Sequence, residues 1–112
     1  MVVITSSSPF GSTARTQVLL ALRLLGDSYA RELARILDFR LSAVQRALQS
    51  LERDRLIAAR SVGRTRLYRL DPRYLARADL CRYLDRLNEA ETDLRRRVAG
   101  LRRRPRRTSK PL

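Results

Sequence analysis

One segment of the chain places hydrogen-bonding side chains at helical spacing. Between residues 41 and 53, the apolar residues Leu41, Val44, Leu48 and Leu51 fall on one face of a predicted helix. The opposite face carries Ser42, Gln45, Arg46, Gln49 and Arg53. An Arg side chain can donate two hydrogen bonds to guanine O6 and N7, and Gln can pair with N6 and N7 of adenine. This face can therefore recognise bases, although on a single helix it would equally suit contact with solvent.

Other residues suit phosphate groups. Arg40 and Ser42 lie at the N-terminal end of the same predicted helix, where backbone amides and the helix dipole favour an anion. Thr13 and Arg15, at the start of an earlier predicted helix, could hold a phosphate as well. These residue types favour a partner that is rich in phosphate.

The net charge of the chain is +14, and it is unevenly distributed. The 25 cationic residues are 24 Arg and the single Lys110, against 11 Asp or Glu. Residues 12–70 carry a net charge of +7, residues 71–94 of −2 and residues 95–112 of +9. A general preference for Arg would not produce this segregation. An anionic partner is therefore expected, and nucleic acid is the first candidate.

Several classes of protein are excluded by composition. The chain has no His and one Cys, whereas a structural zinc site needs about four such ligands. Neither a carboxylate pair nor a nucleophile with its base is recognisable, so we expect no enzyme, no metal and no cofactor. The lone Cys81 cannot form an intrachain disulfide and favours packing over a redox role. Neither a membrane span nor a signal peptide is recognisable, so we expect a cytoplasmic, nucleoid-associated protein of prokaryotic type.

Three helices and a hairpin are predicted for the first part of the chain. Ser12 or Thr13 would cap a largely buried helix over 14–25 that ends at Gly26. A short helix over 30–37, a tight connector over 38–40 and a helix to about Asp54 follow. The segments 56–59 and 67–70, joined by a Gly-containing turn, predict a β-hairpin. The fold class is therefore mainly α with a small β-hairpin.

The second part predicts one long helix over about 73–101, after a stop at Asp71-Pro72. Its seam has heptad spacing and consists of Leu80, Leu84, Leu87, Glu91, Leu94, Val98 and Leu101. Because a helix of this length has no partner left within the chain, we expect it to form a homodimer. The predicted organisation is a lead-in over 1–11, a domain over 12–71, a dimerisation helix over 72–101 and a flexible basic tail over 102–112.

The first part of the chain resembles the winged helix-turn-helix domain of ArsR-like transcriptional regulators. Four phrases carry this resemblance. They are Ala-Arg-Glu-Leu-Ala at 30–34, Val-Gln-Arg-Ala-Leu-Gln-Ser-Leu-Glu at 44–52, Leu-Ile at 56–57, and Gly-Arg-Thr-Arg-Leu-Tyr-Arg-Leu at 63–70. Each phrase is weak by itself, but the ordered set at compatible spacing is specific. The resemblance covers residues 12–70.

The resemblance implies that the third helix enters the major groove of duplex DNA, with Gln45, Arg46 and Gln49 toward the bases. Arg64, Thr65 and Arg66 would form a wing that reaches a minor groove or the adjacent backbone. Metal-sensing members of the family carry Cys in the second helix, and residues 32–37 contain none. The resemblance is therefore to a variant that does not sense metals.

These features predict a homodimeric, sequence-specific regulator of transcription that represses by occlusion. Its two recognition helices would contact a pseudo-palindrome with half-sites about one helical turn apart. The basic tail would act as an arm that binds DNA without regard to sequence. One alternative is an architectural protein that coats DNA. Another is an adaptor or antitoxin-like module, since Glu91 and Cys81 on the long helix leave room for a different partner.

Overall fold

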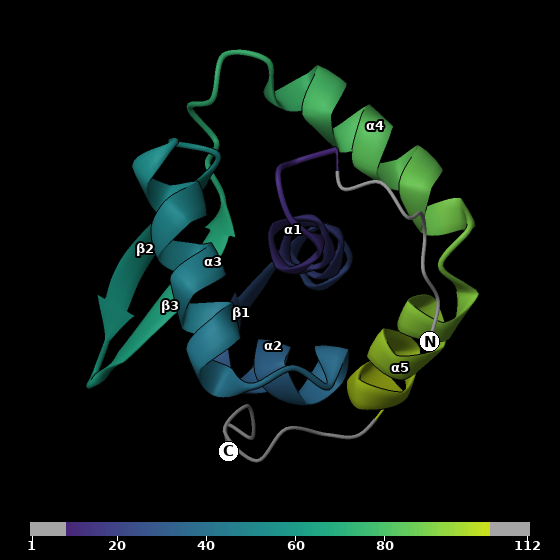
Figure 1. Ribbon diagram of the computed structural model, residues 1–112, viewed down its shortest axis with the longest axis horizontal. Coiled ribbons are helices and arrows are strands. Elements are labelled where there is room, and N and C mark those ends of the chain that lie inside the picture. Colours follow the sequence, from purple (N-terminus) through teal and green to yellow (C-terminus); the bar gives the residue numbers. More distant parts are fainter. Residues whose placement is uncertain (1–8, 104–112) are drawn as a thin grey trace.

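The fold is built around one helix, α1 (Thr13–Leu25), in the computed structural model, which describes residues 9–103 and the side chains as far as Leu101. Figure 1 looks along α1, which lies at the centre with the other helices around it. The five residues from Val18 to Leu22 are each at most 1% exposed. This agrees with the apolar pattern of the segment, which extends beyond one helical face. Most of the lead-in over 1–11 and of the tail over 102–112 lies outside the described residues.

Both ends of α1 are closed as the sequence predicts. The Ser12 side-chain oxygen accepts a hydrogen bond from the backbone N–H of Arg15 at 3.1 Å, which is an N-cap. Gly26 follows the last turn with φ of 92°, and its N–H donates to the Leu22 carbonyl at 2.8 Å. A residue with a side chain would be strained at this φ, so glycine suits the stop.

Helices α2 (Ala30–Leu37) and α3 (Leu41–Arg53) form the predicted helix-turn-helix pair. Asp38 takes a left-handed conformation with φ of 60° between them, and the Phe39 N–H donates to the Ala34 carbonyl at 3.0 Å. The apolar face of α3 packs into the core, where Val44, Leu48 and Leu51 are fully buried. The outward face of α3 is thereby fixed relative to α1.

The hairpin is longer than expected and belongs to a three-stranded antiparallel sheet. Its strands are β2 (Ile57–Val62) and β3 (Thr65–Leu70), so that only Gly63 and Arg64 remain in the turn. Gly63 has φ of 65°, which a two-residue hairpin turn favours. A third strand, β1 (Asp27–Tyr29), was not predicted; it pairs with β3 and gives the order β1-β3-β2.

The prediction of one long helix over 73–101 is wrong. A connector over 71–76 leads to α4 (Arg77–Glu89), and α5 (Thr92–Arg103) follows after a break at Ala90 and Glu91. Arg102 and Arg103, which were expected to begin a flexible tail, are the last residues of α5. The chain turns at the break, so that α4 and α5 both lie beside α1 (Figure 1).

The expectation that the heptad seam has no partner within the chain is also wrong. Leu80, Leu84, Leu94 and Val98 are buried in the same hydrophobic core as α1, and Leu87 and Leu101 pack against it. The Arg23 guanidinium pairs with the Asp85 carboxylate at 2.8 Å, and the Asn88 amide donates to the Leu20 carbonyl at 3.4 Å. The remaining seam residue, Glu91, lies at the break. Helix α1 therefore covers the heptad seam, which the sequence predicts to be covered by a second copy of the chain.

Glu91 is a buried acidic group at the break between α4 and α5. Its side chain is 2% exposed, and its Oε2 has no hydrogen-bond partner within the described residues. Burial raises the pKa of this carboxyl, the charge of Asp93 raises it further, and a hydrogen bond from Gln17 opposes both effects. The folded chain therefore binds the Glu91 proton more tightly than the unfolded chain does.

We predict that Glu91→Gln stabilises the protein increasingly as the pH rises from acid to neutral. Because the folded chain holds the Glu91 proton more tightly, the stability that this carboxyl contributes is full below its ordinary pKa of 4.5 and is lost as the pH rises through the raised value. The Gln side chain does not titrate. Denaturant unfolding of both proteins between about pH 4 and 7.5 measures the difference. A difference that stays constant over this range would contradict the raised pKa of Glu91.

Candidate nucleic-acid interface

The outward face of α3 gathers five of the residues that the sequence singles out. The side chains of Ser42, Gln45, Arg46 and Gln49 are exposed, and Arg40 is exposed immediately before them. They alternate with Val44, Ala47 and Leu48, which are buried. The helix thus presents amide and guanidinium groups outward along its length while its inner face is held in the core.

The N-terminal end of α3 is open. Arg40 is its N-cap residue, with an extended backbone, and its side chain makes no capping hydrogen bond. The Arg40 carbonyl accepts from the N–H groups of Ala43 and Val44 at 3.0 and 3.2 Å, which starts the helix. Because no side chain caps the first turn of α3, the backbone N–H groups of this turn can bind an anion, and the Arg40 guanidinium lies beside them.

The β2–β3 hairpin projects beyond α3 (Figure 1) and is fastened to it by an ion pair. The Arg66 guanidinium lies 2.7 Å from the Glu52 carboxylate near the end of α3, and 5.8 Å from the centre of the Tyr68 ring. The pKa of Arg66 is raised by its interaction with Tyr68 and by the charge of Glu52. At the hairpin turn, Arg64 is exposed and has no partner among the described side chains, and Thr65 is exposed beside it.

Arg15 lies apart from the open end of α3. Its guanidinium pairs with the Asp54 carboxylate at 2.9 Å and also donates to the Ser50 hydroxyl and to the Phe10 carbonyl. These contacts tie the start of α1 to the C-terminal end of α3. The structure thus gives Arg15 protein partners where the sequence suggested a phosphate. Thr13, the first residue of α1, is exposed.

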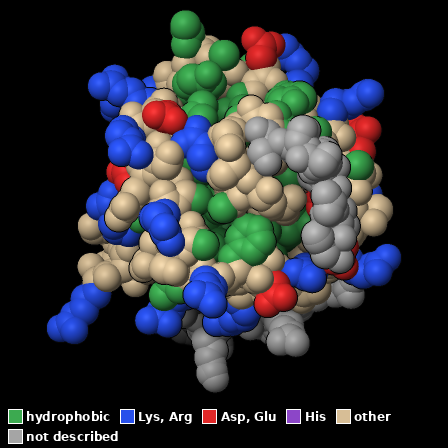
Figure 2. Space-filling view, in the orientation of Figure 1, with side chains coloured by type: hydrophobic (Ala, Val, Ile, Leu, Met, Phe, Trp, Pro, Cys, Tyr) green, Lys and Arg blue, Asp and Glu red, His purple; other side chains and the backbone are tan. Residues whose placement is uncertain are grey.

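Ion pairing divides the arginines into two groups. Those within 4.0 Å of a carboxylate are Arg15, Arg23, Arg66, Arg82, Arg86 and Arg97. Arg40, Arg46 and Arg64 have exposed guanidinium groups without a protein partner in the described part of the chain. Figure 2 shows cationic side chains along the left and lower edges of the molecule, where Figure 1 places the hairpin, α3 and α2. These three arginines lie on the helix-turn-helix pair and at the turn of the hairpin.

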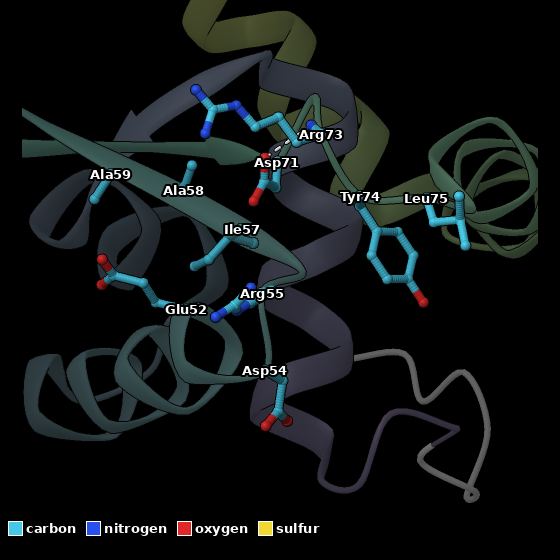
Figure 3. A pocket seen from close by; sticks show the side chains of 10 residues that line it. All are labelled: Glu52, Asp54, Arg55, Ile57, Ala58, Ala59, Asp71, Arg73, Tyr74 and Leu75. Carbon is cyan, nitrogen blue, oxygen red and sulfur yellow. Dashed lines mark hydrogen bonds between the residues drawn. The ribbon is translucent and has the colours of Figure 1, made fainter.

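A groove of about 620 Å³ lies behind the hairpin. Ile57, Ala58 and Ala59 of β2 line it together with residues from the end of α3 and from the connector 71–75 (Figure 3). Glu52 also lines the groove, and the Asp71 carboxylate accepts from the N–H of Arg73 at 2.8 Å. Because Glu52 also pairs with Arg66, the groove is connected to β3 as well as to β2.

The candidate interface is held in position by two acidic residues to which the sequence assigned no role. Glu52 closes the phrase at residues 44–52, and it anchors the hairpin through Arg66. Asp54 holds Arg15 at the end of α3. The only sign of either role in the sequence is an acidic residue within a cationic stretch. The arginine that each one binds lies on another element and could not be identified from the sequence.

Metal ligands do not cluster in the part of the chain that the structure describes. Among residues 9–103, no group of three or more Cys, Asp or Glu side chains is arranged to hold an ion. Cys81 is buried in the core on α4. Separately, no helix within these residues combines the length and the apolar character that crossing a membrane requires.

Solved structures of ZitR from Lactococcus lactis have a similar arrangement of elements. A variant in which a glutamate is replaced by alanine matches with a TM-score of 0.61 at 16% identity, over 89% of this chain and 68% of that one. The apo form of a variant that lacks a cysteine and a histidine matches with a TM-score of 0.54 at 20% identity, over 73% of this chain and 65% of that one. The chain has a winged helix-turn-helix fold.

The likeness to ZitR extends to the fold and no further at these identities. The chain spans about two thirds of the length of the ZitR chains that it matches. No family model matches the sequence, and no curated protein does. In the terms of the winged helix fold, α3 occupies the position of the recognition helix and the β2–β3 hairpin that of the wing.

We predict that Arg15→Ala lowers the free energy of unfolding by about 1–3 kcal/mol, because it leaves the Asp54 carboxylate and the Ser50 hydroxyl without their partner. Arg53→Ala is the matched control, since it removes the same charge from an exposed position of α3. The control is expected to stay within about 0.5 kcal/mol of the parent protein. Urea unfolding measures both variants, and equal losses would show that the Arg15 contacts contribute nothing.

Proposed function

We propose that the protein is a regulator of transcription that binds duplex DNA in a sequence-specific manner. The observation that carries the proposal is the outward face of α3, where Gln45, Arg46 and Gln49 are exposed on a recognition helix whose other face is locked in the core. The wing beside this helix and the excess of unpaired arginines support the same function.

In this proposal α3 enters the major groove. Arg46 donates two hydrogen bonds to a guanine, while Gln45 and Gln49 pair with adenines. Arg40, Ser42 and the uncapped first turn of α3 bind the phosphate at the edge of the groove. The phosphate contacts set the register of the helix, and the Arg and Gln contacts supply the sequence preference.

The wing contacts the neighbouring minor groove or backbone through Arg64 and Thr65 at its turn. Arg66, which the sequence also suggested as a contact, holds the wing against α3 through Glu52. An exposed ion pair of this kind contributes little stability by itself. Its effect in the proposal is to limit the angle between the wing and the recognition helix.

The proposed regulator is ArsR-like and does not respond to metals. The structures that it resembles belong to a metal-responsive regulator, and variants of that protein at cysteine, histidine and glutamate positions have been solved. The present chain has no His, its helix α2 contains no Cys, and its single thiol is buried. The sequence therefore offers one buried thiol and no imidazole, whereas a structural zinc site needs about four such ligands.

Homodimerisation and repression belong to the proposal. Two copies would recognise a pseudo-palindrome and block the polymerase from the same DNA. The heptad seam does not suit the dimer interface in this conformation, because its residues pack on α1. Two exposed apolar side chains lie on or beside α4 and could contact a second copy. They are Leu75, which precedes α4 and is 98% exposed, and Tyr83 of α4.

An architectural protein that coats DNA is the second candidate, and the net charge of +14 favours it. The two candidates differ in the ratio of affinities for one chosen site and for random duplex. Selection of bound duplexes from a random pool, followed by competition with unselected duplex, distinguishes them. A pool without enrichment would overturn sequence-specific regulation and leave the coating function.

We predict that Arg46→Ala relaxes the sequence preference at one base position by about 1–3 kcal/mol, because it removes the two hydrogen bonds to guanine. Arg82→Ala on α4 is the matched control, since it removes the same charge from an exposed helical position remote in the fold from α3. Competition binding with the selected duplex and its single-base variants measures both proteins. If the two variants have the same base preference, Arg46 does not recognise bases.

A further inference from the structure

Three consecutive arginines on α5 have different surroundings. The Arg97 guanidinium donates to the Ile36 carbonyl at 2.6 Å and lies 3.3 Å from the Asp93 carboxylate. Arg95 and Arg96 are exposed, and neither guanidinium has a hydrogen bond or ion pair among the described residues. One of the three arginines therefore has a structural role, and the guanidinium groups of the other two are available to a partner.

Arg97 fastens α5 to the helix-turn-helix pair. Ile36 belongs to the last turn of α2. The carbonyl groups there lack a partner within the helix, and the C-terminal end of the helix dipole carries a partial negative charge. A guanidinium at this position satisfies one of these carbonyls and interacts favourably with the dipole. Because α2 packs directly on α3, α5 is held in a defined position relative to the recognition helix.

Helix α2 adds two more exposed arginines to this side of the molecule. Arg31 and Arg35 lie one turn apart on its outward face, and neither has a partner in the described part of the chain. Two acidic residues lie near them: Glu32 on α2, which is half-buried and accepts a hydrogen bond from the Ser28 hydroxyl at 2.6 Å, and Asp38 at the C-terminal end of the helix. In Figure 1, α2 lies between α3 and α5, so each of these three neighbouring helices carries exposed arginines.

Helix α4 has a different charge pattern, because it carries three Arg and three acidic residues. Arg82 pairs with Asp79, Arg86 lies 4.0 Å from Glu89, and Asp85 pairs with Arg23 of α1. Figure 2 shows acidic and cationic side chains together along the upper edge, where α4 lies. The charges of α4 are thus balanced within the helix, whereas α2 and α5 each carry more Arg than acidic residues.

We propose that α2 and α5 form a second DNA-binding surface, which contacts backbone phosphates beside the major groove and does not discriminate between sequences. We call this the α2–α5 surface; it consists of Arg31, Arg35, Arg95 and Arg96. The inference rests on the proposed function, because it assumes that α3 brings duplex DNA to this side of the molecule. Arg97 is a positioning residue for this surface, since it holds α5 against α2.

Phosphate is the ligand that the chemistry of this surface fits. Unpaired guanidinium groups on two neighbouring helices attract a line of phosphates, and exposed helix faces offer no pocket that would select a base. Each phosphate contact releases condensed counterions, so that the affinity becomes more dependent on salt. The surface therefore raises the affinity for all duplexes and leaves the preference between them unchanged.

The test compares the full-length parent protein with Arg95→Gln/Arg96→Gln, using the selected duplex and a random duplex over a range of NaCl concentrations. We expect the affinity for both duplexes to fall by the same factor. The slope of log K against log salt should become less negative by about 0.9 for each phosphate that the variant no longer binds. Arg82→Gln/Arg86→Gln is the matched control, because it removes the same charge from α4. It should leave the slope within about half a unit of the parent value.

Three outcomes would overturn the α2–α5 surface. The first is a slope for Arg95→Gln/Arg96→Gln that equals the slope of the α4 control. The second is a loss of affinity confined to the selected duplex, which would indicate base recognition. The third is failure of the parent protein to bind any duplex at low salt, which would overturn the proposed function as well and is recognised without any variant. Thermal unfolding should be unchanged in Arg95→Gln/Arg96→Gln, while Arg97→Gln should lower the midpoint because it removes the hydrogen bond to Ile36.

Discussion

The burial of α1 on all sides is the constraint on which the rest of the structure depends. A helix of 13 residues whose apolar side chains extend beyond one face must be covered from every direction. Helices α2 and α3 and the sheet cover part of it, and α4 and α5 cover the remainder. Since α3 is one of the covering elements, its inner face is occupied by the core. Its outward face is left to the polar residues.

The same constraint explains the break between α4 and α5. A 13-residue helix is about 20 Å long, whereas one continuous helix over residues 73–101 would be about 43 Å long and could not stay in contact with it. Folding back at Ala90 lets both halves of the seam pack on α1. Each buried Leu or Val contributes about 1.5–3 kcal/mol. The gain outweighs the cost of burying Glu91 at the turn, and that cost is reduced because its carboxyl stays protonated more readily.

Local patterns were sufficient to predict α1, α2, α3 and the hairpin, because period, caps and the Gly63 turn are encoded within each element. Strand β1 was missed because its three residues become a strand only by pairing with β3, which is distant in the sequence. The heptad seam predicted burial without revealing whether the partner helix belongs to the same chain. For the candidate site, exposure along α3 followed from its period. The partners of Arg15 and Arg66 lie on other elements, so the spacing within a single helix or strand could not pair them.

The arginines of this chain serve two purposes, and ion pairing separates them. Arg66 joins the wing to α3 through Glu52, and Arg97 joins α5 to α2 through Ile36. Each of these contacts fixes one cationic element relative to the recognition helix before any ligand is bound. A surface whose parts are already in place loses less conformational entropy on binding than one that must assemble. In the proposed function, the paired arginines therefore favour the binding of DNA by holding the unpaired ones at a fixed spacing.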